Sequence, residues 1–338
     1  MATPKRILVT GGAGYVGAIL VPKLLEKGFN VRVLDLYIYG EHVLAPYKAN
    51  PRLEQVKGDI RNAEVVRQRL RGIDVVIHLA CISNDPSCDL DPALTKSINY
   101  DAFIPLVKTC KDAGVERFIF ASSSSVYGLS DAPDVKEDHP RVPVSDYNRY
   151  KAKCEDLLAQ EDTKRFPWVV IRPATICGYS PRLRLDLTVN ILTNHAFNKG
   201  EITVFGGSQY RPNLHIQDVT DLYVRLVDEP LSRIAGKTYN AGYQNHTVRE
   251  IAEMVKRVVE TQYPIKAPLP IVATKSDDVR SYRISCEKIE RELGFKPKHT
   301  IEDAARELCV AFSDGRVPDP LTSSRYYNIT TMKGIGLK

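Results

Sequence analysis

The feature that most constrains this chain is a glycine-rich stretch near its N-terminus. A short apolar run, Arg6-Ile7-Leu8-Val9-Thr10, leads into Gly11, Gly14 and Gly17, and leucines at helical spacing follow. This order predicts a strand, a tight turn and a helix. Gly11 can adopt backbone angles closed to other residues, Gly14 lets a ligand approach the backbone, and Gly17 allows close packing of the helix. A purely structural turn is the alternative, but the flanking strand and helix favour binding of a dinucleotide pyrophosphate.

A second apolar run ends in an acidic residue. Residues 30–34 have the pattern of a strand, and Asp35 stands 18 residues after Gly17. A carboxylate at this place can accept hydrogen bonds from both ribose hydroxyls of an adenosine, and it repels the additional phosphate of NADP. Asp35 therefore favours NAD, although a strand-end aspartate that caps a turn is the alternative.

Strands and helices alternate as far as Pro173. Apolar runs predict strands at 53–56, 74–80, 118–122 and 168–173, and helical patterns cover 63–70, 92–113 and 145–160. This alternation predicts an α/β fold with a Rossmann-type, doubly wound parallel sheet. His78 lies inside one of the apolar runs, so we expect a packed histidine rather than a base.

The simple alternation is lost beyond Pro173. Further helices are predicted at 186–199, 217–228, 247–262, 285–293 and 300–314, and further strands at 202–205 and 238–241. We expect residues 1–175 and 213–244 to form the dinucleotide-binding domain. Residues 176–212 and 245–316 are expected to form a smaller, mixed α/β substrate-binding region. The tail, 317–338, has no pattern that explains it.

Charge and cysteine usage exclude several classes of function. The formal net charge is +6, with lysines and arginines scattered rather than clustered, so no nucleic-acid surface is expected. No apolar run approaches the roughly 20 residues of a membrane span. The seven cysteines show no Cys-x-x-Cys spacing, and no metal-ligand cluster occurs. The first strand begins too early to leave room for a signal peptide, so we expect a cytoplasmic protein.

The second informative stretch is Tyr147-Asn148-Arg149-Tyr150-Lys151. Its first and last residues are four apart, so on a helix both side chains share one face. A lysine ammonium and a positively charged nicotinamide both favour the phenolate, which lowers the pKa of Tyr147 from near 10. A serine from the run Ser122 to Ser125 can hydrogen-bond the same substrate oxygen. Such a set can remove a proton from an alcohol while a hydride passes to NAD; a surface tyrosine–lysine pair is the alternative.

In combination these motifs resemble the extended short-chain dehydrogenase/reductase family. Within it the resemblance is to the NAD-dependent nucleotide-sugar epimerases and dehydratases, and it covers residues 5–312. The stretches that carry it are Thr10 to Gly17, His78-Leu79-Ala80, Ser122 to Gly128, Tyr147 to Lys151, Arg172-Pro173 and Arg211 to Asp218.

The resemblance implies roles for individual residues. It implies that Ser123, Tyr147 and Lys151 are catalytic, with Ser124 as the second choice for the serine. Cofactor contacts are implied for Gly11, Gly14, Tyr15, Val16, Gly17, Asp35, Asp59, Ile60, Leu79, Ala80, Tyr147, Lys151 and Pro173. Substrate contacts are implied for Ser124, Thr175, Arg211 and Arg280, with Lys275 as an alternative phosphate ligand. It also implies a homodimer formed by the helices at 92–113 and 145–160.

The departures from the family pattern are informative. The 4,6-dehydratases place Asp-Glu after the catalytic serine or threonine, whereas this chain has Ser124-Ser125. We therefore expect a C4 epimerase of a nucleotide-diphosphate sugar. The alternatives are a C4 dehydrogenase or 4-keto-sugar reductase, an epimerase at C3 or C5, a 4,6-dehydratase, and a non-catalytic NAD-binding subunit.

Two further features stay open at this point. Arg182 and Arg184 belong to an unusual stretch and either reach the substrate or face solvent. Cys81 and Cys177 are either an acid/base near the sugar or packed thiols.

Overall fold

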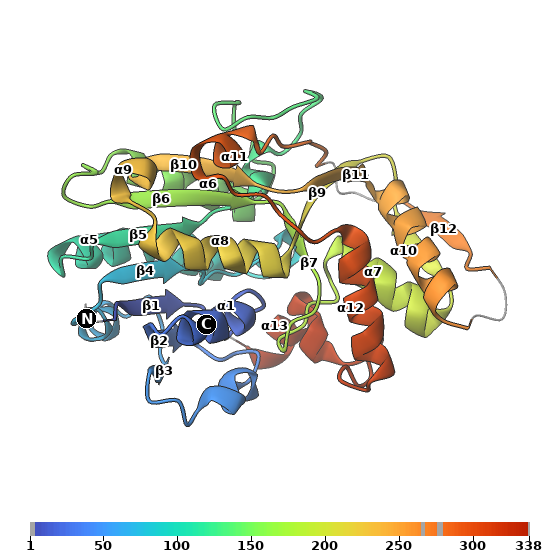
Figure 1. Ribbon diagram of the computed structural model, residues 1–338, viewed down its shortest axis with the longest axis horizontal. Helices are drawn as coiled ribbons and strands as arrows, with labels where there is room; N and C mark the ends of the chain where they lie inside the picture. Colours follow the sequence, from blue (N-terminus) through green and yellow to red (C-terminus); the bar gives the residue numbers. More distant parts are fainter. Residues whose placement is uncertain (1–3, 265–267, 276–279, 337–338) are drawn as a thin grey trace.

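A seven-stranded parallel sheet forms the larger part of the molecule (Figure 1). The computed structural model describes residues 4–264, 268–275 and 280–336. The strand order is β10-β6-β5-β4-β1-β2-β3. The bounds are β1 (Arg6–Thr10), β2 (Asn30–Asp35), β3 (Leu53–Lys57), β4 (Val75–His78), β5 (Arg117–Ala121), β6 (Trp168–Pro173) and β10 (Lys237–Ala241). From β1 the chain builds the sheet in both directions, which confirms the predicted doubly wound fold. In such sheets the ligand crevice lies at the carboxyl ends of the strands, where the direction changes.

Helices cover both faces of this sheet, and the central strands β4 and β6 are correspondingly buried along their whole length. Alternate residues of β1 face opposite layers, since Ile7 and Val9 belong to one core cluster and Leu8 to the other. One layer contains α1 (Gly17–Glu26), α8 (Ile216–Asp228) and α11 (Glu287–Leu293). The other contains α2 (Ala63–Arg69), α5 (Phe103–Asp112) and α6 (Asp146–Ala159).

His78 is a packed histidine, as expected. Its side chain is buried, its Nδ1 lies 2.7 Å from the Thr10 hydroxyl, and its ring lies against Phe103, Phe118 and Phe120. Burial lowers its pKa to about 3, so the ring is neutral at physiological pH.

The smaller region has mixed sheet structure (Figure 1). Strand β9 (Tyr210–His215) pairs parallel with β7 (Thr175–Cys177) and antiparallel with β11 (Gln244–Thr247). A separate pair consists of β8 (Ile202–Phe205) and β12 (Ile271–Thr274). The helices α7 (Thr188–Asn194), α10 (Val248–Gln262) and α12 (Ile301–Ser313) belong to this region. They share a third apolar core, so the predicted mixed α/β region is present. The division into two functional domains stays a prediction.

Several element boundaries differ from the predictions. The helix expected at 92–113 consists of α4 (Pro92–Lys96), a π-helical turn at Ser97–Asp101 and α5. The helix expected at 186–199 begins at Thr188 and ends in a π-helical turn. The strand expected at 74–80 ends at His78, because the chain leaves the sheet there to enter the short helix α3 (Asp85–Cys88). Among the described residues, no helix is long and apolar enough to cross a bilayer.

The C-terminal tail is ordered by long-range contacts. A 3-10 turn at Ser324–Tyr326 is followed by α13 (Asn328–Ile335), and the backbone carbonyl of Tyr326 accepts the N–H of Leu185 at 2.9 Å. Tyr326 and Met332 are buried in different apolar clusters. No side chain caps the start of α13, so the sequence carries no local signal that a helix begins there.

Candidate active site

A cavity of about 530 Å³ lies at the carboxyl ends of the parallel strands, between the sheet and the smaller region. The residues that were the first choices for a catalytic, cofactor or substrate role all line it, whereas the alternatives Lys275 and Cys177 do not. These first choices are Gly11, Gly14, Tyr15, Val16, Gly17, Asp35, Asp59, Ile60, Leu79, Ala80, Ser123, Ser124, Tyr147, Lys151, Pro173, Thr175, Arg211 and Arg280. Their individual roles are taken up as proposals below.

The glycine turn has the close backbone contacts that the sequence predicted. Gly11 has φ +74°, and a Cβ there would lie 2.7 Å from the backbone nitrogen of Ala80. A Cβ on Gly17 would lie 2.3 Å from the carbonyl oxygen of Gly12, so α1 starts tightly against the turn itself. Neither position accepts a larger residue without a shift of the backbone. The turn therefore fits a dinucleotide pyrophosphate, which needs bare backbone at the start of a helix.

Asp35 stands beside this turn at the end of β2. Its carboxylate accepts the N–H of Ala13 at 2.9 Å and the N–H of Tyr37 at 2.7 Å. Burial raises its pKa above the ordinary value, although the two N–H groups act in the opposite direction. Asp35 therefore caps the following turn and also lines the cavity, and its contact with a ribose stays a prediction.

Tyr147 and Lys151 lie in the first turns of α6, as their spacing predicted. The helix begins at a capping box in which Ser145 and Asn148 bond each other's backbone. The ammonium of Lys151 donates to the carbonyl oxygen of Ala121 at 2.6 Å and lies 5.9 Å from the centroid of the Tyr147 ring.

The pKa of Tyr147 departs from its prediction. Removal from water raises the pKa of its hydroxyl well above the ordinary value, and the nearby Cys81 acts in the same direction. The expected lowering is therefore wrong for the protein by itself. The prediction also included the positive charge of a nicotinamide, which the protein does not supply.

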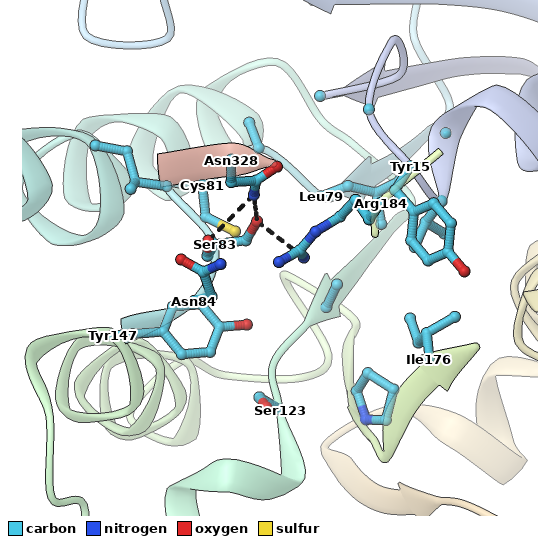
Figure 2. A pocket seen from close by; sticks show the side chains of 18 of the residues that line it. Tyr15, Leu79, Cys81, Ser83, Asn84, Ser123, Tyr147, Ile176, Arg184 and Asn328 are labelled. Atoms are coloured by element: carbon cyan, nitrogen blue, oxygen red, sulfur yellow. Dashed lines mark hydrogen bonds between the residues drawn. The ribbon is translucent and has the colours of Figure 1, made fainter. Parts of the chain in front are cut away.

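The hydroxyls of the serine run Ser122 to Ser125 have different hydrogen-bond partners. The Ser122 hydroxyl donates to the Glu155 carboxylate, away from the cavity's tyrosine. The Ser123 hydroxyl lies 2.8 Å from that of Ser125, and the Ser124 hydroxyl lies 3.3 Å from that of Tyr282. Figure 2 shows Ser123 and Tyr147 at the same side of the cavity. Ser123 and Ser124 both line the cavity, and the choice of Ser123 as the catalytic serine stays a prediction.

Arginines surround another part of the cavity. Arg211 is buried and donates to the carbonyl oxygens of Tyr210, at 3.0 Å, and of Arg280. Arg280 forms an ion pair with Asp85. Arg280 lines the cavity, whereas Lys275 does not appear among the lining residues.

The structure gives the positions of the two arginines and two cysteines for which the sequence left alternatives open. Arg182 and Arg184 are both buried in the cavity wall and do not face solvent. Cys81 lines the cavity. The Cys177 thiol is buried and directed at the carbonyl oxygen of Leu214, which is the packed-thiol alternative.

Some lining residues had no predicted role at all. They come from the segment after β2, the segment after β4, the stretch before α7 and the tail: Tyr39, Ser83, Asn84, Asp186 and Asn328. The unusual arginine pair pointed to the stretch that contains Asp186. Nothing in the sequence pointed to Asn328.

The sequence model of the family described as "NAD dependent epimerase/dehydratase family" matches residues 7–242. The chain belongs to this family. It is therefore an NAD-dependent enzyme, in agreement with the choice of NAD made from Asp35.

Individual relatives are similar at a moderate level. The UDP-glucose 4-epimerase of Lactobacillus helveticus is 28% identical over 313 residues, covering 87% of this chain and 92% of the relative. UDP-glucuronic acid decarboxylase 1 of Arabidopsis thaliana is 29% identical, covering 91% of this chain and 69% of the relative.

Solved structures with the same fold differ in their reactions. DesIV, a dTDP-glucose 4,6-dehydratase from Streptomyces venezuelae with NAD bound, has a TM-score of 0.82 and 26% identity, covering 94% of this chain and 100% of that one. The UDP-glucuronic acid 4-epimerase from Bacillus cereus, with UDP-glucuronic acid and NAD, has a TM-score of 0.80 and 25% identity, covering 91% and 99%. Because epimerases, a dehydratase and a decarboxylase all match, similarity alone does not select the reaction.

Proposed function

We propose that this protein is an epimerase that inverts C4 of a nucleotide-diphosphate sugar by transient oxidation. One observation carries the proposal. Tyr147, Lys151 and Ser123 line the same cavity as the glycine turn, while the two positions after Ser123 hold hydroxyls instead of carboxylates.

In the proposed oxidation and reduction at C4, three side chains have separate roles. NAD, when bound, supplies reversible acceptance of a hydride from C4. Tyr147 takes the proton from the C4 hydroxyl and later returns it, and the Lys151 ammonium stabilises the phenolate. The Ser123 hydroxyl hydrogen-bonds the same substrate oxygen. Return of the hydride to the opposite face of the 4-keto sugar inverts C4, so the cofactor ends the cycle unchanged.

The carboxylates of the cavity argue against dehydration. Elimination needs an acid and a base beside the sugar, and the described lining residues include three carboxylates, each with bonding partners in place. Asp35 accepts two backbone N–H groups and Asp59 pairs with Arg61 at 2.6 Å. Asp186 pairs with Arg184 at 2.9 Å. The chain also has Ser124-Ser125 at the positions where the resemblance to 4,6-dehydratases implies Asp-Glu.

We assign Arg211 and Arg280 to the diphosphate of the substrate, with Ser124 and Thr175 as further substrate contacts. A guanidinium offers a planar set of donors that matches phosphate oxygens. The main-chain carbonyl of Arg280 holds Arg211 in place, so the two residues act together.

The test is a panel of UDP-, GDP-, CDP- and dTDP-sugars incubated with the purified protein. We expect one of them to yield its C4-inverted isomer by NMR, with no net absorbance change at 340 nm. A stoichiometric change at 340 nm would contradict the epimerase and identify a net dehydrogenase or reductase instead. Loss of water from the sugar, visible by mass spectrometry, would identify a dehydratase.

We also propose a cytoplasmic homodimer that packs through the helical segment 97–112 and α6. These elements adjoin, with Tyr100 and Tyr150 stacked at 5.9 Å, and Ile104 leaves 47% of its surface exposed on the same segment. Sedimentation equilibrium is expected to give the mass of two chains; the mass of one chain at micromolar concentration would contradict the dimer.

A further inference from the structure

Arg182 is buried in the cavity wall without a full set of partners. Its exposed fraction is 4%, and its guanidinium stacks on the Tyr39 ring at 3.5 Å. One terminal nitrogen donates to the side-chain oxygen of Asn328. The remaining donors, Nε and Nη1, are buried and have no hydrogen-bond partner. Among the residues that the structure describes, no carboxylate forms an ion pair with Arg182, because Asp186 pairs with Arg184 instead.

Such an arginine destabilises the folded protein unless a ligand supplies the missing acceptors and negative charge. Buried donors without acceptors destabilise a fold, and a buried charge without a counter-charge does so more strongly. Burial, together with the like charge of Arg184, lowers the pKa of Arg182 to about 10. Arg182 is one of the residues that line the cavity, so an anion bound against this wall can supply the negative charge that the guanidinium lacks.

The position of Arg182 identifies the part of the cavity that it serves. Its positive charge acts on the carboxylate of Asp35 and on Tyr15 of the glycine turn. The segment that carries Arg182 is also attached to this turn, since the Ser180 hydroxyl donates to the carbonyl oxygen of Tyr15 at 2.8 Å. The arginine therefore lies on the adenosine side of the cofactor site, at the glycine turn.

We propose that Arg182 binds the pyrophosphate of NAD from the side opposite the glycine turn, and that Asn328 of the tail positions it. The pyrophosphate is the anionic part of the cofactor, and the turn was already matched to it. The ribose is matched to Asp35, and the adenine is neutral. A guanidinium keeps its positive charge and offers several planar N–H donors, which suits it to phosphate oxygens.

Asn328 connects three separate segments at this wall. Its side-chain nitrogen donates to the Ser83 hydroxyl at 3.0 Å, and its backbone N–H donates to Asp186 at 3.2 Å. Its side-chain oxygen accepts from Arg182. Figure 2 shows Asn328 bonded to Ser83 above the cavity, with Arg184 bonded to the same hydroxyl. The tail thus completes an outer wall that retains the cofactor. This inference rests on the use of NAD and not on the sugar reaction.

The test is the variant Arg182→Met, studied by calorimetric titration of the full-length protein after removal of bound nucleotide. We expect the affinities for NAD and ADP to fall by about tenfold or more, the effect of losing hydrogen bonds to a charged group, and the affinity for adenosine to stay unchanged. Arg316→Met is the matched control. Arg316 also stacks on a tyrosine, Tyr179 at 4.7 Å, but is exposed and does not line the cavity, so all three affinities should be unchanged.

Asn328→Ala tests the positioning role. We expect a smaller loss with the same ligand pattern, affecting NAD and ADP but not adenosine, together with a lower Tm, because the substitution removes the hydrogen bonds of a buried side chain. Native ADP affinity in Arg182→Met would overturn the proposal. Weakened UDP binding with native ADP binding would also overturn it, because the arginine would then serve the nucleotide sugar. An equal loss for adenosine would show that Arg182 only supports the shape of the cavity. No sugar is present, so these outcomes are independent of the proposed epimerisation.

Discussion

Tyr147→Phe is expected to reduce kcat/KM for the epimerised sugar by a factor of about 10² to 10⁴, the range in which a positioned general acid or base contributes. The substitution removes the phenolic oxygen to which we assign the proton of the C4 hydroxyl, and it keeps the aromatic ring. Lys151 keeps its bond to the carbonyl oxygen of Ala121, so we expect the affinity for NAD to stay close to that of the native protein. Initial rates with the sugar identified in the panel, together with an NAD titration, measure both quantities.

Tyr150→Phe is the matched control for this experiment. Tyr150 lies on the same helix, stacks on Tyr100 and does not line the cavity, so activity should be retained. Native activity in Tyr147→Phe would contradict the proposed mechanism. It would favour another base or the non-catalytic, NAD-binding alternative.

Glu155→Gln is expected to lower the free energy of unfolding by about 3–5 kcal/mol, the usual cost of breaking a buried ion pair by removing one partner. Glu155 and Arg172 each expose 5% of their side chains, and their charged atoms approach to 2.6 Å. Burial by itself lowers the pKa of Arg172, but the hydrogen bonds and charge of Glu155 outweigh it and raise the pKa. The amide of glutamine leaves this guanidinium buried without its main counter-charge.

The same substitution should also affect catalysis. The Ser122 hydroxyl donates to Glu155, and Ser122 directly precedes the proposed catalytic Ser123.

Urea unfolding followed by circular dichroism measures the free energy of unfolding of Glu155→Gln. Glu161→Gln is the control, because Glu161 pairs with the half-exposed Lys111 at 2.6 Å, and such surface pairs contribute roughly 0–1 kcal/mol. A loss below 1 kcal/mol for Glu155→Gln would contradict the assignment of a buried, stabilising pair.

Features that depend on neighbours in the chain were predictable from the sequence. The strand before Gly11, the acid at the end of β2 and the four-residue spacing of Tyr147 and Lys151 are all local patterns. Ser145 caps α6 through a contact only three residues long, so the helix begins where the sequence indicates. Long apolar runs likewise predict buried parallel strands without knowledge of their partners.

Other features depend on residues that are far apart in the sequence, and these could not be predicted. The expectation for the pKa of Tyr147 was wrong because burial depends on how the whole cavity closes. The Arg172–Glu155 pair joins a strand to a helix, and no spacing rule connects them.

The cavity wall that contains Asn328 separates most clearly what the sequence determined from what the tertiary structure determined. By itself the sequence determined the parallel sheet, the glycine turn, the acid at the end of β2, and the helix that carries Tyr147 and Lys151. Only the tertiary structure decided that the tail returns to the cofactor site, because Asn328 contacts Arg182 across 146 residues and Ser83 across 245. A short helix without a cap owes its order to such contacts rather than to its own propensity.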